Sequence, residues 1–72
     1  MKKTYRIEDL DCAHCAQKME EAIGKLEGVL FVRINFLSER LTLEVEEGRL
    51  DAIMKEVDRI CRDIEPDCRI VL

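Results

Sequence analysis

The sequence predicts a small α+β domain in which a four-stranded antiparallel sheet carries two helices on one face. The chain has 72 residues, the length of a single small domain. Its apolar residues alternate in four short stretches, as in strands, and recur at helical spacing in two longer stretches. These stretches follow one another in the order β-α-β-β-α-β, which makes two βαβ halves of similar length.

The first half begins with a strand and a helix. Residues 4–9 alternate between apolar and polar and predict the first strand. Residues 13–26 predict a helix, in which Asp11 stands at or just before the N-cap and Gly28 follows the end. The apolar face of this helix consists of Cys15, Met19, Ala22, Ile23 and Leu26.

Two further strands follow as a hairpin. Residues 29–36 and 40–46 both alternate, and residues 37–39 between them have the composition of a turn. The side chains expected to face the core from this hairpin are Val32, Ile34, Phe36, Leu41, Leu43 and Val45.

The second half ends with a helix and a last strand. An amphipathic stripe from Leu50 to Ile64 predicts the second helix, and Pro66 ends it. Residues 68–72 alternate and predict the fourth strand. The whole chain, residues 1–72, is therefore expected to form one ferredoxin-like domain with a split βαβ arrangement.

Composition excludes several classes of protein. With 12 Lys and Arg against 16 Asp and Glu, the net charge of −4 argues against nucleic-acid binding. The apolar runs are short and interrupted by charge, and Lys2 and Lys3 are followed by polar residues rather than by a signal sequence. We therefore expect a soluble cytoplasmic domain, where a tight Cys-x-x-Cys indicates metal binding or thiol catalysis.

Cys12 and Cys15 stand at the predicted junction of the first strand and first helix. A two-residue spacer lets both sulfur atoms converge on one ion, and the helix N-terminus favours the thiolate form that binds metal. Thiolates prefer soft or borderline ions such as Cu(I), Zn(II), Cd(II) and Pb(II). The alternative is a thiol–disulfide oxidoreductase, but the strand order differs from that of thioredoxin-like enzymes and no aromatic residue directly precedes Cys12.

On these residues the chain resembles the heavy-metal-associated domain family, which includes cytosolic metallochaperones and N-terminal domains of heavy-metal-transporting P-type ATPases. The family motif Gly-Met-x-Cys-x-x-Cys corresponds to residues 9–15, with Asp9 for Gly and Leu10 for Met. Residues 26–29, Leu-Glu-Gly-Val, are similar to the family's helix-to-strand turn.

The resemblance implies a carrier rather than a catalyst. Cys12 and Cys15 would bind one metal ion and pass it by ligand exchange to or from a membrane ATPase or a metallochaperone. The alternative is a domain that senses metal and regulates the ATPase without transferring the ion. The acidic balance favours an ATPase N-terminal domain over a stand-alone chaperone. We expect a monomer, with a metal-bridged dimer as the alternative.

Asp11 is the residue on which the expected choice of metal rests. Its carboxylate directly precedes Cys12 and would complete a three-ligand site for Zn(II), Cd(II) or Pb(II). An Asp-Cys-x-x-Cys motif is similar to what zinc-, cadmium- and lead-transporting ATPases carry at this place. Zn(II), Cd(II) or Pb(II) is therefore preferred to Cu(I), and the alternative is that Asp11 only caps the helix.

The remaining candidate ligands are expected to have other roles. His14 lies within the spacer and is interpreted as a surface residue, with ligation as the alternative. Cys61 falls in the apolar stripe of the second helix and is expected to pack in the core. Cys68 is also expected in the core, although its strand starts beside the metal loop, which leaves a third-thiol role open. A structural zinc site made by all four cysteines is the least favoured alternative.

Overall fold

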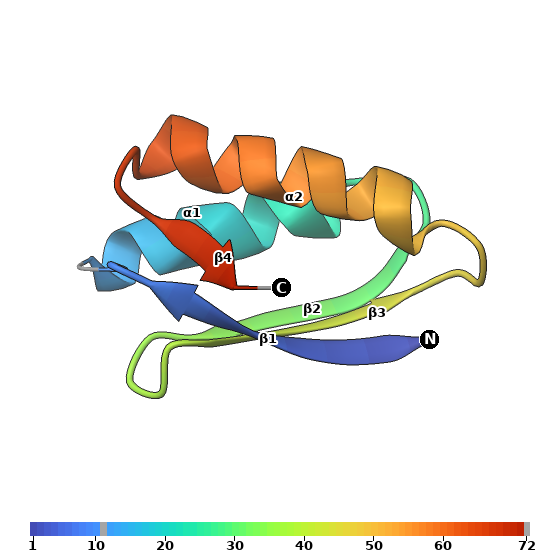
Figure 1. The fold of residues 1–72 in the computed structure, drawn as a ribbon, viewed down its shortest axis with the longest axis horizontal. Helices are drawn as coiled ribbons and strands as arrows, with labels where there is room; N and C mark the ends of the chain where they lie inside the picture. The colour runs from blue at the N-terminus through green and yellow to red at the C-terminus, as the bar shows by residue number, and fades with distance from the viewer. Residues whose placement is uncertain (11, 72) are drawn as a thin grey trace.

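The computed structural model describes residues 1–10 and 12–71, and it confirms the predicted α+β architecture. Both helices cover the same face of one sheet (Figure 1). The elements in chain order are β1 (Lys2–Glu8), α1 (Ala13–Gly24), β2 (Val29–Asn35), β3 (Arg40–Val45), α2 (Leu50–Ile64) and β4 (Arg69–Val71).

The sheet has the strand order β2-β3-β1-β4, and all neighbours are antiparallel. β1 pairs with β3 along Lys2–Arg6 and with β4 along Arg6–Glu8. The end of β1 therefore lies beside the start of β4. This pairing brings the segment before α1 and the segment after α2 to the same end of the molecule (Figure 1).

The core between sheet and helices is aliphatic, with Met19 and two cysteines among its buried side chains. The central strand β3 contributes three side chains with 0% exposure, Leu41, Leu43 and Val45. α2 buries Ile53, Val57, Ile60 and Cys61 of its predicted apolar stripe. α1 buries Met19 and Ile23 of its predicted stripe, together with Ala16, which the spacing did not include, while Cys15, Ala22 and Leu26 are only partly buried. Within the described residues, neither helix is long and apolar enough to cross a membrane.

The first and last strands differ slightly from their predicted extents. The first was expected over 4–9, but β1 runs from Lys2 to Glu8. It stops there because Asp9 has φ 60°, a left-handed conformation that a strand does not contain. The last strand, expected over 68–72, is Arg69–Val71 within the described residues.

The first helix is two residues shorter than predicted. It ends at Gly24, and Leu26 belongs to the following turn, where its N–H donates to the carbonyl of Ile23 at 3.0 Å. Gly28 then has φ 92°, and a Cβ at this position would lie 2.6 Å from Cδ of Arg49. Glycine is therefore required at this turn for both conformation and space.

Candidate metal site

Both cysteines of the motif lie where the loop after β1 enters α1. Cys12 has an extended backbone (φ −135°, ψ 118°) and is the N-cap of α1, and Cys15 lies in the first turn. Leu10, only 5% exposed, holds the preceding part of the loop in the core. Asp9 adopts its left-handed conformation where the family motif has glycine, and aspartate tolerates this region better than most residues. The loop is thus anchored, while both cysteines remain half-buried.

The side chains of Cys12 and Cys15 are hydrogen-bonded to each other. The Cys15 thiol and the Cys15 backbone N–H, 3.2 Å from Cys12 Sγ, lower the pKa of Cys12 because both hydrogen bonds stabilise its thiolate. The same contact, followed by burial and the charge on Cys12, raises the pKa of Cys15 to about 11. Cys12 is therefore the thiol of the pair that loses its proton first, and Cys15 retains its proton.

This proton-sharing pair has the chemistry of a soft-metal site. A soft cation between the sulfur atoms would supply the positive charge that a second thiolate needs, and its binding would displace the proton of Cys15. The N-terminus of α1 adds a partial positive charge at Cys12.

A third group beside the pair, Glu65, was missed in the sequence. It is the C-cap of α2, and its carboxylate raises the pKa of Cys15 through a hydrogen bond and through its negative charge. Its backbone is fixed on both sides, because its N–H donates to the carbonyl of Cys61 at 2.8 Å and its carbonyl accepts from Cys68 at 2.9 Å. The antiparallel pairing of β1 with β4 is the signal that places this residue near the motif.

Cys61 and Cys68 form a second, buried pair. They are 1% and 3% exposed, which confirms the prediction that both pack in the core. Burial raises the pKa of Cys61 to about 12 and is also the main cause of the raised pKa of Cys68. Both thiols are therefore protonated near neutral pH and poor metal ligands in this state.

The described residues contain no group of three or more His, Cys, Asp and Glu side chains arranged to hold a metal ion. The four-cysteine site is thus not assembled, and His14 is exposed on α1, as expected of a surface residue. The predicted ligand role of Asp11 lies outside the residues that the structure describes. The N-cap position that was considered for Asp11 belongs to Cys12.

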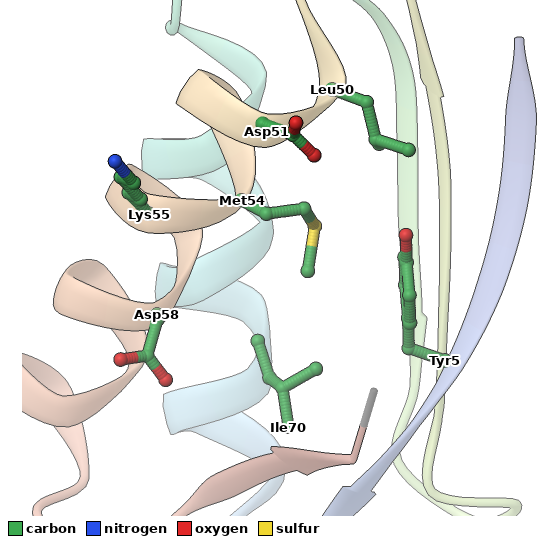
Figure 2. A pocket seen from close by; sticks show the side chains of 7 residues that line it. All are labelled: Tyr5, Leu50, Asp51, Met54, Lys55, Asp58 and Ile70. Carbon is green, nitrogen blue, oxygen red and sulfur yellow. The ribbon is translucent and has the colours of Figure 1, made fainter.

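A cavity of about 520 Å³ lies elsewhere, between α2 and the strands β1 and β4. Figure 2 shows its lining side chains, which come mainly from α2 and include none of the four cysteines. Met54 and Tyr5 face each other across it (Figure 2). The hollow is therefore separate from the thiol pair.

Comparison with known proteins relates the whole domain to metal-handling proteins. The pattern of the heavy-metal-associated domain matches residues 4–65. The chain is 34% identical over 64 residues to a probable copper-exporting P-type ATPase of Archaeoglobus fulgidus, covering 89% of this chain and 8% of that protein. It is 29% identical over 52 residues to the copper chaperone CopZ of Enterococcus hirae, covering 72% of this chain and 75% of CopZ.

Relatives named for other metals match as well. A zinc/cadmium/lead-transporting P-type ATPase of Escherichia coli is 35% identical over 43 residues, covering 60% of this chain and 6% of that protein. Among solved structures, the N-terminal domain of a potential copper-translocating P-type ATPase from Bacillus subtilis superposes with a TM-score of 0.75 at 27% identity, covering 99% of this chain and 84% of that domain. The chain spans less than a tenth of the two full-length ATPases.

With its fold, its Cys-x-x-Cys loop and a family match over most of its length, the chain belongs to the heavy-metal-associated domain family.

Proposed function

We propose that this domain binds one soft or borderline heavy-metal ion through Cys12 and Cys15 and exchanges it with a partner protein. The observation that carries the proposal is the half-exposed, hydrogen-bonded thiol pair at the N-terminus of α1. An exposed site with few ligands allows a partner's thiolate to attack the ion before the first bond is lost. A closed four-ligand site would instead retain the ion.

The proposed partner is a metal-transporting P-type ATPase. The domain either is part of such a transporter, which it supplies or regulates, or is a chaperone that delivers metal to one. Relatives of both kinds support this, since the chain matches a small segment of the ATPases and most of CopZ. The domain itself carries the ion and catalyses no reaction.

Cu(I) is the ion that the names of the relatives support better. Both the Archaeoglobus ATPase and CopZ are named for copper, as is the solved Bacillus domain. Two thiolates are the soft donors that Cu(I) prefers. Copper is therefore a full alternative to the divalent ions that the sequence favours.

Zn(II), Cd(II) or Pb(II) is supported by the carboxylate of Asp11. This residue adjoins Cys12 in the sequence. Oxygen donors complete zinc sites but add little for Cu(I). The zinc/cadmium/lead-transporting relative supports the same assignment.

Competitive titration of the reduced, metal-free protein tests the proposal. Zn(II) and Cu(I) are titrated against chromogenic chelators for wild type, Asp11→Ala and Cys12→Ser/Cys15→Ser. The double serine variant is expected to bind neither ion. If Asp11 is a ligand, Asp11→Ala weakens Zn(II) binding by about tenfold or more and leaves Cu(I) binding nearly unchanged.

Unchanged Zn(II) affinity in Asp11→Ala would remove its ligand role, and unchanged binding in the double serine variant would overturn the proposal. Catalytic turnover in an insulin-reduction assay would favour an oxidoreductase instead. Analytical ultracentrifugation of the loaded protein distinguishes the expected monomer from a metal-bridged dimer.

A further inference from the structure

The two faces of the sheet have opposite character. The face under the helices is buried, whereas the other face has no layer of secondary structure on it (Figure 1). Side chains alternate along each strand, so the residues between the buried ones point to this open face. The cross-strand register places these charged residues there: Lys2, Arg6, Glu8, Arg33, Arg40, Glu44 and Arg69.

The open face is basic although the chain is acidic. It carries five of the chain's 12 Lys and Arg residues but only two of its 16 Asp and Glu residues. One of these carboxylates, Glu8, forms an ion pair with Arg69. The open face therefore has a net charge of +3, whereas the rest of the chain has a net charge of −7.

Three arginines form the centre of this basic face. Arg6 and Arg40 are directly opposite each other on neighbouring strands, and Arg33 lies diagonally next to Arg40 on β2. Like charges in opposite positions, with Cβ atoms about 5 Å apart, repel and destabilise a sheet. None of the ion pairs within residues 1–10 and 12–71 involves any of the three. An anionic partner would relieve this repulsion.

Apolar side chains lie on the same face. The register puts Phe31 and Val71 there, and they are 45% and 40% exposed. Leu30, 62% exposed, adjoins Phe31 at an irregularity in the pairing of β2. The open face thus combines guanidinium groups with exposed apolar side chains, as surfaces at a lipid interface do.

We propose that the open face of the sheet binds the surface of an anionic lipid bilayer. The two cavities lined by residues of α2 lie on the helical side of the sheet, away from this face. The exposed Phe31 and Val71 on the same face favour a bilayer, which offers an apolar layer beneath its charged surface, over nucleic acid. Each basic residue close to an anionic bilayer contributes to binding, and this electrostatic interaction falls off within a Debye length. The acidic residues on the opposite side of the domain lie farther from the bilayer and therefore repel it only weakly.

This orientation keeps the thiol pair accessible. The start of α1, where Cys12 and Cys15 stand, follows the end of β1. This junction lies at one end of the sheet, and α1 covers the face opposite the open one (Figure 1). A domain lying on the bilayer would therefore present its cysteines along the membrane surface.

Vesicle co-sedimentation tests the proposal on the reduced, metal-free chain. The probes are phosphatidylcholine vesicles with and without 30% phosphatidylglycerol, at low salt and at 0.5 M NaCl. Arg6→Gln/Arg33→Gln/Arg40→Gln removes three charges from the open face, and Lys55→Gln/Arg59→Gln/Arg62→Gln is a control of equal charge on α2. Circular dichroism and metal titration establish that both variants fold and bind metal.

We expect wild type and the α2 control to bind only anionic vesicles and to dissociate at 0.5 M NaCl, with the control within about threefold of wild type. The open-face variant should lose at least about tenfold in partitioning. Equal losses in both variants, or no vesicle binding by wild type, would overturn the proposal. Binding to poly-glutamate without binding to vesicles would assign the face to an acidic protein and overturn it as well.

Discussion

The four cysteines form two pairs that differ in environment far more than in composition. Cys12 and Cys15 lie half-buried at the N-terminus of α1, where the pKa of Cys12 is lowered. Cys61 and Cys68 lie in the core, where burial raises both pKa values. In each pair the two side chains are hydrogen-bonded. Thiol contact alone therefore does not distinguish the two pairs. Access to solvent and stabilisation of one thiolate do, and both favour the proposed metal site at Cys12 and Cys15.

Alkylation should show the largest difference between the pairs. Cys12 is expected to react with iodoacetamide at pH 7 at least about 1000-fold faster than Cys61, because reaction requires the thiolate and the pKa of Cys61 is about 12. Mass spectrometry of peptides from the metal-free protein measures each rate. Comparable rates at Cys12 and Cys61 would contradict the contrast between the pairs.

Metal affinity should separate the pairs next. Loss of a group that only orients a metal ligand lowers metal affinity by about 10–100-fold. Cys12→Ser removes a proposed ligand itself, so it is expected to weaken Cu(I) and Zn(II) binding by more than about 100-fold. Cys61→Ala should leave affinity within about threefold and lower stability instead, because it removes a buried sulfur. Chelator competition and urea unfolding measure the two effects. A strong loss of affinity in Cys61→Ala would connect the core pair to the site.

Stability of the metal-free protein should fall at high pH because of the core pair. Burial in the folded state raises the pKa of Cys61 from 9.0 to about 12, so the folded state disfavours the thiolate that the unfolded chain readily forms. The contribution of the protonated Cys61 to the free energy of unfolding is therefore complete below pH 9 and is lost as the pH rises toward 12. The loss is at most about 1.4 kcal/mol per pH unit for one group. Urea unfolding at pH 8 and pH 10.5 measures it. The decline should be smaller in Cys61→Ala, and an identical decline would assign it to other groups.

Substitution of Glu65 should have the smallest of these effects, a change in the pKa of Cys15 in the exposed pair. Glu65→Gln removes a charge and a hydrogen-bond acceptor that favour the protonated Cys15, so the pKa of Cys15 should fall below about 11. Titration of thiolate absorbance at 240 nm measures the change. Asp67→Asn is the matched control, because this neighbouring carboxylate is not a cause of either shift in the pair. Equal shifts in both variants would rule out a specific contact with Glu65.

Much of this molecule could be predicted from periodicity. The stripe from Leu50 to Ile64 gave α2 with both ends correct, because its apolar residues repeat clearly and Pro66 follows. The end of β1 was wrong by one residue, since the left-handed backbone of Asp9 is a conformation that aspartate adopts only occasionally. Strand pairing, not local pattern, brings Glu65 to the cysteines.

The metal loop could be predicted only in part. The spacing of Cys12 and Cys15 at the start of a helix was sufficient to place the thiol pair. The division of protons between them depends on which sulfur accepts the hydrogen bond, and this follows from the N-cap geometry of Cys12 rather than from the spacing.

The pairing of β1 with β4 also has a consequence for the order in which the domain is made. A ribosome completes Cys12 and Cys15 early and adds Glu65 and β4 only near the end of the domain. Until β4 pairs, the nascent chain has two thiols without the carboxylate that helps keep Cys15 protonated. The proton balance of the finished thiol pair is therefore reached only after the last part of the domain has folded.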